Sequence, residues 1–283
     1  MLNQLEIITP GEDFYRNNIT FNTVAEIKHL VEQYLGHLGV NYFTFDRTYA
    51  DGSHIRLTSA GEWIEHYYRD QLYDVAIFEK NPNMFNRGVV FWKELSREPI
   101  YSEAALFDIE HGLTITEPFN TYCDFFHFGA SRDNHIPRIY LSSKLDVLYN
   151  FVDLFRERTK KHIKLAEKTR FILKVKANSE FAIKDVSTIA KLPVVDQANV
   201  RRFYLGEDFN NSYLTSKELQ VLHMLNDGCK LVDIAKNNHT SEKTIDKHIE
   251  NIKNKLKCRT MFELGAIAHN LGIPKLHNPK KLS

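Results

Sequence analysis

The feature that most constrains this chain lies near its C-terminal end, where signals for the start and end of helices recur in order. A Thr-x-x-Glu pattern stands at Thr215 to Glu218 and again at Thr260 to Glu263. In such a capping box the hydroxyl and the carboxylate satisfy backbone N–H groups that the first helical turn leaves unpaired. Each box therefore predicts the start of a helix, and Gly228 predicts the end of the first one.

Two further helices are predicted between the boxes. A short helix carries Leu231, Ile234 and Ala235, and the turn that follows contains asparagines, which tolerate a left-handed backbone. A longer helix runs from Glu242 to Leu256, with Ser241 as its N-cap. Its apolar residues recur three or four positions apart, so one stripe must face a core. They are Ile245, Ile249, Ile252 and Leu256.

The opposite face of this longer helix is polar and offers hydrogen-bonding groups for base edges beside cations for phosphates. It carries Lys243, Thr244, Asp246, Lys247, Glu250 and Asn251, with Lys253 and Lys257 near the end. From residue 214 to the end there are 12 Lys and Arg against 7 Asp and Glu, or +5, which leaves −4 for residues 1 to 213. We predict a four-helix helix-turn-helix domain that binds double-stranded DNA; a helical oligomerisation bundle is the alternative.

The same stretch resembles the LuxR-type DNA-binding domain. The matching positions run from Leu214-Thr-Ser-Lys-Glu218 through Ser241-Glu-Lys-Thr-Ile-Asp-Lys-His248 to Lys255-Leu256. The resemblance implies that residues 242 to 256 form the recognition helix in the major groove, with base contacts from Asp246, Lys247 and Glu250. It places Lys243, Thr244 and Asn251 close to the DNA backbone. Family members often carry a cation where Asp246 stands, so we expect altered specificity and modest affinity.

The preceding residues predict an α+β fold, in which an N-terminal α/β/α sandwich surrounds a mostly antiparallel sheet. Apolar periodicity and turn residues carry this prediction. Helices are expected at 22–38, 102–111 and 143–170, the last as one helix or two, and strands at 41–50, 54–59, 88–92, 113–119 and 122–130.

Aromatic residues crowd this N-terminal part, either because they pack a core or because they line a ligand pocket. The segment from Trp63 to Tyr67, followed by Trp92, Phe107 and His111-Gly-Leu-Thr114, resembles the autoinducer-binding domain of quorum-sensing regulators. The resemblance implies that Trp63 and Tyr67 bind the head group of an acyl-homoserine lactone, with Asp74 accepting from its amide and Trp92 and Phe107 completing the site. Asp74 stands closer to Tyr67 than in the family, so a different ligand, or none, is the alternative.

These interpretations divide the chain into a sensor domain (1–173), a partly ordered linker (174–212) and a DNA-binding domain (213–283). Residues 183–189 and 200–205 of the linker are apolar enough to be ordered. We expect a homodimeric transcription regulator controlled by a small molecule, because helix-turn-helix readers gain affinity from paired half-sites. The alternative is a ligand-independent regulator whose N-terminal domain serves dimerisation or protein interaction.

Other classes of protein fit the sequence less well. We expect no enzyme, because nucleophile elbow, phosphate loop, dinucleotide fingerprint and paired-carboxylate patterns are missing. A phosphate-switched receiver domain needs alternating strands and helices, which the N-terminal part does not predict. The cysteines Cys123, Cys229 and Cys258 lack metal-ligand spacing, so no metal or cofactor is expected. No apolar run approaches the ~20 residues of a membrane span, and no signal pattern opens the chain, so we expect a cytoplasmic protein without membrane contact.

Overall fold

The computed structural model describes residues 5–79, 82–95, 99–131, 144–174, 202–205, 209–210, 212–271 and 273. The chain divides into two compact units, Met1–Gln197 and Ala198–Ser283. The apolar segment at 183–189, which we expected to be ordered, lies outside the described residues. None of the helices within the described ranges is long and apolar enough to cross a membrane.

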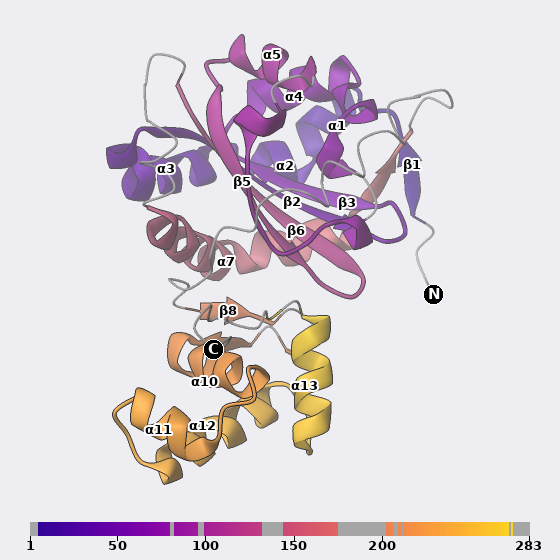
Figure 1. Cartoon of the computed structure of the whole chain (residues 1–283). Helices are drawn as coiled ribbons and strands as arrows, with labels where there is room; N and C mark the ends of the chain where they lie inside the picture. The colour runs from indigo at the N-terminus through magenta and orange to yellow at the C-terminus, as the bar shows by residue number, and fades with distance from the viewer. Residues whose placement is uncertain are drawn as a thin grey trace. The chain divides into compact units, whose positions relative to one another are not determined.

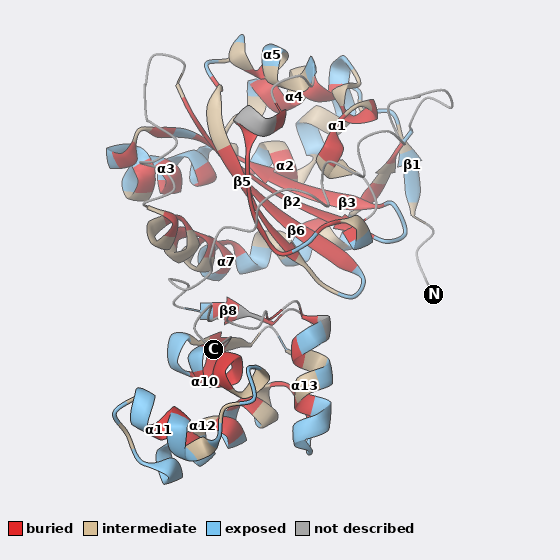
Figure 2. Cartoon of the chain, viewed as in Figure 1, coloured by how far each residue is buried: buried red, intermediate tan, exposed pale blue. Residues whose placement is uncertain are grey.

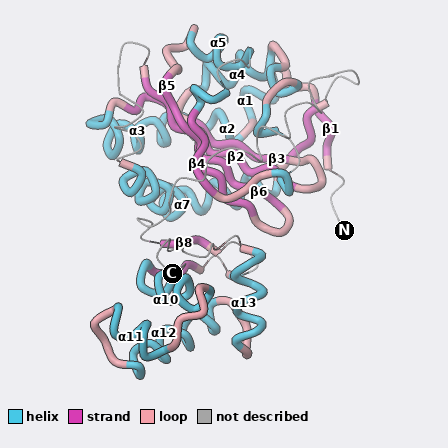
Figure 3. The backbone as a smooth tube through the Cα atoms, viewed as in Figure 1, coloured by secondary structure: helices cyan, strands magenta, loops and turns pink. Residues whose placement is uncertain are grey.

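A single seven-stranded sheet forms the centre of the first unit, with the strand order β1-β7-β3-β2-β6-β5-β4 (Figure 3). All neighbouring strands are antiparallel except β1 and β7, which are parallel. The strands are β1 (Glu6–Ile8), β2 (Val40–Tyr49), β3 (His54–Thr58), β4 (Gly88–Phe91), β5 (His111–Pro118), β6 (Tyr122–Ala130) and β7 (Phe171–Leu173). The predicted α+β fold with a mostly antiparallel sheet is confirmed, and of these seven strands only the short β1 and β7 were not predicted.

Helices cover both faces of this sheet, with α3 and α7 on one side and α4 and α5 on the other (Figure 1). The helices are α1 (Glu12–Asn17), α2 (Ile19–Asn22), α3 (Val24–Leu35), α4 (Gly61–Arg69), α5 (Pro99–Ala105) and α7 (Leu145–Lys168). Short 3-10 helices complete the unit: η1 (Gly36–Leu38), η2 (Leu72–Asp74), η3 (Ile77–Glu79), η4 (Pro82–Met84) and η5 (Trp92–Leu95). The segment predicted as one helix or two at 143–170 is a single helix. The helix expected at 102–111 is α5, which is shorter and begins earlier, and α1, α2 and α4 were not predicted.

Strand β2 shows why both faces are buried. Phe43 and Phe45 point to the side of α3 and α7 and are fully buried there against Phe126 and Phe155. Side chains alternate along a strand, so Asp46 points to the opposite side, beneath α4. A polar residue at that position would ordinarily indicate a solvent-facing side, but here helices cover it.

The second unit contains the four predicted helices, which are α10 (Ser216–Asn226), α11 (Leu231–Asn237), α12 (Glu242–Lys255) and α13 (Met261–Asn270). Both predicted capping boxes are present, and Ser241 Oγ accepts a hydrogen bond from the Thr244 N–H at 3.2 Å. A two-stranded hairpin precedes the helices, made of β8 (Arg202–Tyr204) and β9 (Tyr213–Thr215). Strand β8 lies in the segment expected to be linker, and its Phe203 is buried in the core of the helices.

The turn between α11 and α12 differs from the expectation that an asparagine takes the left-handed conformation. His239 does so, with φ at 50°. Asn238 keeps an ordinary backbone, and its Nδ2 donates to the carbonyl oxygen of Ile234 at 2.9 Å. Because the amide side chain caps the end of α11, the reversal of the chain falls on the next residue.

Candidate nucleic-acid interface and candidate ligand cavity

Helix α12 has one buried face and one exposed face. Ile245, Ile249, Ile252 and the following Leu256 are buried in the core that α10, α11 and α13 share. This burial stabilises the helix by roughly 1.5 to 3 kcal/mol for each side chain, and it fixes which side remains in solvent. Figure 2 shows the outward sides of α11 and α12 as exposed.

The structure brings most of the predicted DNA-binding residues together on this exposed face. Lys243, Thr244, Asp246, Lys247, Glu250 and Asn251 are all exposed. At 100° per residue, a central stripe opposite the isoleucines contains Lys243, Lys247, Glu250 and Asn251, whereas Thr244 and Asp246 flank it. Asn254 is exposed in the same stripe and was not among the predicted site residues, although the helical spacing alone identifies it.

The two remaining predicted residues lie at the far end of the helix. Lys253 is half-buried, and its Nζ donates to the Arg259 carbonyl oxygen at 3.3 Å. Lys257 follows the helix with a left-handed φ of 52°, and its Nζ lies 3.4 Å from Asn210 Oδ1. Both side chains lie at the C-terminal end of α12, and their contact with DNA stays a prediction.

The charges on the exposed face are available to a partner. Within the described part of the chain, Lys243, Lys247, Asp246 and Glu250 form no ion pair. The N-terminus of α12 adds the positive end of the helix dipole, which favours a phosphate. The face therefore offers two lysines and a helix N-terminus for phosphates, together with carboxylates and amides for base edges.

A cavity of about 70 Å³ lies in the first unit between the sheet and helices α4 and α5. Trp63, Tyr67 and Trp92, three of the five residues predicted to bind a ligand, line it together. Its other lining residues are Tyr42, Asp46, Arg56, Ile64, Ala76, Phe78, Glu79, Ile100, Tyr101, Ala104, Ile109 and His127. The charged members of this set were not predicted from the sequence.

Asp74 and Phe107 do not line the cavity. Asp74 is buried at the end of η2, where the left-handed Gln71 has turned the chain away after α4. Phe107 packs on Trp63 and His66, with ring centroids 5.5 and 5.0 Å apart. The family resemblance implied both residues for the site, but the structure places them in other contacts.

Arg56 of β3 is the centre of a buried group of charges at the cavity. Its Nε and Nη2 donate to the two oxygens of Asp46 on β2 at 2.5 and 3.0 Å, because the strand register places these residues opposite each other. Nη2 also donates to Glu79 Oε1 at 2.7 Å, which accepts from Tyr67 Oη at 2.7 Å as well. His127 Nε2 lies 3.2 Å from the second Asp46 oxygen.

The group shifts the pKa values of its members in opposite directions. Burial opposes ionisation of Asp46, but the positive charge of Arg56 and the hydrogen bonds from His127 and Arg56 together outweigh burial and hold the pKa of Asp46 below its ordinary value. Burial and the negative charge of Glu79 raise the pKa of Tyr67, so its hydroxyl remains a donor. The cavity therefore has one charged end, in which hydrogen bonds fix each side chain.

Two glycines make room for Trp92. A Cβ atom on Gly112 would clash with the Phe128 carbonyl oxygen and would lie 2.5 Å from Trp92 Cε3, while one on Gly129 would lie 3.1 Å from the same indole ring. The Trp92 indole N–H donates to Thr114 Oγ1 at 2.9 Å, and Thr114 Oγ1 lies 2.8 Å from His127 Nδ1. These contacts hold the Trp92 ring against the cavity.

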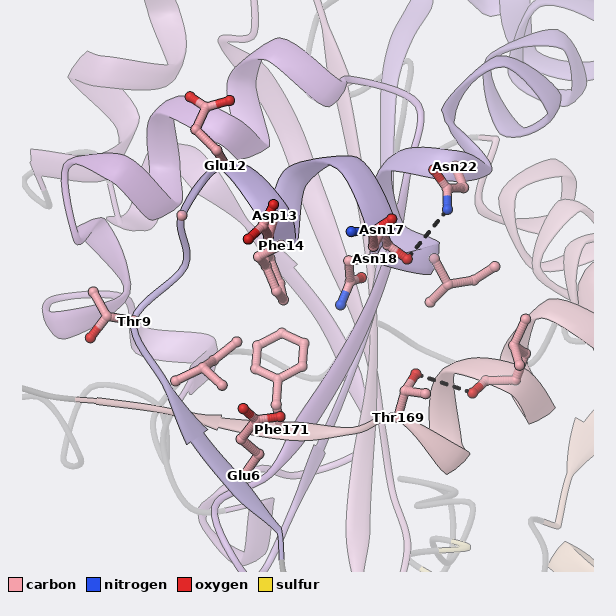
Figure 4. Close-up of a pocket in the computed structure, with 14 residues that line it drawn as sticks. Glu6, Thr9, Glu12, Asp13, Phe14, Asn17, Asn18, Asn22, Thr169 and Phe171 are labelled. Atoms are coloured by element: carbon pink, nitrogen blue, oxygen red, sulfur yellow. Dashed lines mark hydrogen bonds between the residues drawn. The ribbon is translucent and has the colours of Figure 1, made fainter.

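A larger and more open groove of about 680 Å³ lies beside β1, α1 and the end of α7. Figure 4 shows Glu12, Asp13 and the Asn17–Asn18 pair on one side of it, with Glu6 and Phe171 on the other. Its charged lining residues are all acidic. The asparagines serve the local backbone, since Asn18 Oδ1 caps α2 by accepting from the Thr20 N–H.

Among the described residues, no group of three or more His, Cys, Asp or Glu side chains is arranged to hold a metal ion. Cys123 and Cys258 are buried and Cys229 is half-buried, all as free thiols.

Comparisons with known proteins identify the C-terminal unit. Residues 212–268 match the GerE family, described as bacterial regulatory proteins of the luxR family. No curated protein matches the chain closely enough to count as a relative. One similar solved structure is SdiA in complex with octanoyl-rac-glycerol, at 16% identity and a TM-score of 0.38, over 96% of this chain and 100% of that one. Another is Escherichia coli SdiA, at 17% identity and a TM-score of 0.35, over 89% of this chain and 92% of that one.

The two TM-scores are too low to carry a residue role from SdiA to this chain, so the N-terminal likeness to an autoinducer-binding domain stays a prediction. The family match covers α10, α11 and α12, with the exposed face of α12, and most of α13. The C-terminal unit is a helix-turn-helix domain of the luxR family of bacterial regulatory proteins.

Proposed function

We propose that this protein is a transcription regulator that binds double-stranded DNA in a sequence-specific manner through α12. The observation that carries the proposal is the two-sided character of this helix. Its isoleucine face is buried, whereas Lys243, Lys247, Glu250 and Asn251 share an exposed face without intramolecular ion pairs among the described residues. A helix presented in this way fits the major groove, where phosphates orient it and base edges are read.

Within this face, Lys247 is the residue best placed for a base contact. It lies one turn into the helix and at the centre of the exposed stripe, and the LuxR resemblance assigns base readout to the same position. Lys243 and Thr244 lie nearer the helix N-terminus, where phosphates are bound. We assign backbone contacts to Lys243, Thr244 and Asn251, and base contacts to Asp246, Lys247 and Glu250.

Selection from random duplexes with the purified full-length protein, followed by footprinting, tests this function. In fluorescence anisotropy on the selected duplex, Lys247→Ala should weaken binding by about 1 to 3 kcal/mol. Lys160→Ala is the matched control, because Lys160 is exposed on α7 of the other unit. A protein that ignores every duplex even in dilute salt, or two lysine variants with the same affinity, contradicts the proposal.

We further propose that the protein acts as a homodimer on paired half-sites, as helix-turn-helix readers do. Light scattering of the protein with its selected duplex measures the stoichiometry. Two chains on each duplex and an inverted or direct repeat in the selected sequence are expected. One chain on each duplex contradicts dimeric binding without affecting the assignment of α12.

The first unit is proposed to sense a small molecule in the cavity that Trp63, Tyr67 and Trp92 line. Aromatic walls that surround a few fixed polar groups are typical of ligand sites. The volume of about 70 Å³ favours a second candidate, in which the unit binds no ligand and serves dimerisation. Known sites for drug-sized ligands occupy about 300 to 1,000 Å³. An acyl-homoserine lactone that changes DNA affinity in the anisotropy assay supports the sensor. A crystal structure in which side chains fill this interior completely supports the alternative.

A further inference from the structure

We infer that the open edge of the sheet at β1 binds an extended segment of a partner protein, in which basic residues alternate with apolar ones. The segment adds a strand beside β1 and directs its basic side chains into the acidic groove of about 680 Å³ beside β1 and α1. This edge lies outside the residues that match the luxR family, and no sequence pattern pointed to it.

The first observation is a strand edge with outward backbone groups. Among the described residues β1 is the last strand of the sheet and pairs with β7 alone. The N–H of Lys174, which follows β7, donates to the Ile8 carbonyl oxygen at 3.0 Å. In this parallel register Glu6 and Ile8 direct their backbone groups toward β7, so the N–H and carbonyl oxygen of Ile7 point away from the sheet. Such an edge is a template for an added strand.

The second observation is that the two faces of the sheet differ at this edge. Glu6 and Ile8 point to one face and line the groove, as Phe171 of β7 does. Ile7 points to the other face, where it is 67% exposed. An added strand also directs alternate side chains to the two faces. Side chains next to Glu6 and Ile8 therefore enter the groove, and a side chain next to Ile7 covers an exposed apolar residue.

The third observation is the charge of the groove. Glu6, Glu12 and Asp13 are its charged lining residues, and all three are exposed. Within the described ranges Glu6 and Asp13 form no ion pair, and Glu12 has only a contact of 3.8 Å with the exposed Arg16. Figure 4 shows Asp13 and Glu6 on opposite sides of the groove. A Lys or Arg side chain between them can lay its aliphatic stem on Phe171 and place its cation near both carboxylates.

The size and charge of the groove favour a basic partner over a second copy of this chain. Its volume lies within the range of about 300 to 1,000 Å³ that ligand sites occupy, which leaves room for side chains of a bound segment. Two β1 strands paired antiparallel about Ile7 would form one continuous sheet, with both acidic grooves on the same face. Like charges side by side oppose that pairing.

A fluorescein-labelled peptide of the sequence Ser-Val-Arg-Val-Arg-Val-Ser is the probe. Its arginines share one face of an extended strand and its valines share the other. Anisotropy with the full-length protein should show saturable binding that weakens as salt is added. Replacement of both arginines by glutamate should abolish binding. A probe that does not bind, or a glutamate peptide that binds equally well, overturns the inference.

Methylation of the peptide backbone tests whether the segment adds a strand. In an antiparallel arrangement the residue opposite Ile7 is a valine and exchanges both backbone hydrogen bonds with it, whereas in a parallel arrangement the arginines supply these groups. N-methylation of the valines should therefore abolish antiparallel binding, and N-methylation of the arginines should abolish parallel binding. Binding that survives both changes overturns strand addition.

Substitutions in the protein localise the site. Ile7→Pro removes an N–H on the open side of an edge strand, where proline is tolerated, and should abolish binding. Ile7→Val keeps the N–H and is the matched control. Glu6→Gln should weaken binding about fivefold, whereas Glu32→Gln, on the exposed side of α3, should leave it unchanged. If Ile7→Pro disturbs β1, the glutamate pair still decides, and equal affinities of its two variants overturn the role of the groove.

Two further measurements with the same preparations identify a different occupant and keep the proposals apart. If sedimentation velocity shows that Ile7→Pro dissociates the protein into smaller species, a second copy occupies the edge and the inference is overturned. Equal sedimentation of both proteins is expected. Binding of the selected duplex should be unchanged in Ile7→Pro. A protein that binds the peptide but ignores DNA contradicts the proposed regulator and leaves the assignment of the edge in place.

Discussion

Glu218 in the first turn of α10 and Lys255 in the last turn of α12 form an ion pair, with 2.7 Å between Oε2 and Nζ. The same carboxylate oxygen accepts from the Thr215 N–H at 2.8 Å and from its hydroxyl at 3.0 Å. The Glu218 side chain is 5% exposed, so this pair is much less screened by solvent than a surface pair. One carboxylate thus joins the cap of α10 to the end of the proposed recognition helix.

The first prediction concerns Lys255→Met, which leaves the Glu218 carboxylate buried without its cation. We expect α10 and the C-terminal turns of α12 to lose about 1 to 3 kcal/mol of stability against local opening. Hydrogen exchange of the full-length protein measures this loss. Lys243→Met removes an exposed lysine from the same helix and should leave the exchange unchanged. Equal exchange in both variants would show that the ion pair stabilises nothing.

The ion pair also gives a pH dependence. Burial opposes ionisation of Glu218, but the hydrogen bonds from Lys255 and Thr215 outweigh burial and hold its pKa below the ordinary 4.5. A lowered pKa in the folded state gives stability that is present above pH 4.5 and is lost as the pH falls through the folded value. Exchange in the wild-type protein and in Lys255→Met should therefore converge in acid.

The second prediction concerns Asp246, which flanks the exposed stripe of α12. Asp246→Asn removes a negative charge that repels nearby phosphates but also removes an acceptor suited to cytosine N4. We expect tighter binding to unrelated duplexes and weaker discrimination at one base pair of the selected site, by about 1 to 3 kcal/mol. Anisotropy on the selected duplex and on its single-base variants measures both quantities. If discrimination between bases is unchanged at every position of the site, Asp246 makes no base contact.

The helices of the C-terminal unit were predictable because their signals are local. The capping boxes at Thr215 and Thr260, the N-cap at Ser241 and the isoleucine stripe each lie within one or two turns of the residues they organise. The hairpin before α10 was not predicted. Its strand β8 has three residues, and the burial of Phe203 depends on a core formed by helices later in the chain.

The charged end of the cavity was not predictable, because its residues are far apart in the sequence and meet only in the folded chain. Asp46, Arg56, Glu79 and His127 lie on three strands and a 3-10 helix, and the register of β2 with β3 and β6 brings them together. A polar residue on a strand ordinarily predicts the solvent face. Only the packing of α4 and α5 over that face makes it an interior, and the periodicity of single segments does not contain this information.

The third prediction uses the glycine pair that makes room for Trp92. A methyl group on Gly112 meets the Phe128 carbonyl oxygen in the neighbouring strand, which cannot move without breaking the sheet. A methyl group on Gly129 meets only side-chain atoms, at 3.1 Å. We expect Gly112→Ala to lower the free energy of unfolding by about 1 to 3 kcal/mol or more, and Gly129→Ala to cost less. Thermal unfolding followed by tryptophan fluorescence compares them, and the reverse order would contradict the register of β5 and β6.

The final prediction concerns Asp124, which is fully buried on β6 and bridges two arginines. Its oxygens accept from Arg47 Nε at 2.7 Å and from Arg156 Nη2 at 3.1 Å, which ties the sheet to α7. Arg47 also pairs with Glu167, and Arg156 shares Glu117 with Arg87. Because Asp124→Asn removes one of the three carboxylates that these three guanidinium groups share, we expect a loss of about 3 to 5 kcal/mol in urea unfolding of the N-terminal unit. Glu12→Gln is the control, since its pair with Arg16 is 74% and 82% exposed and such pairs contribute about 0 to 1 kcal/mol. Similar losses in both variants would mean that the buried network contributes no more to stability than a surface pair.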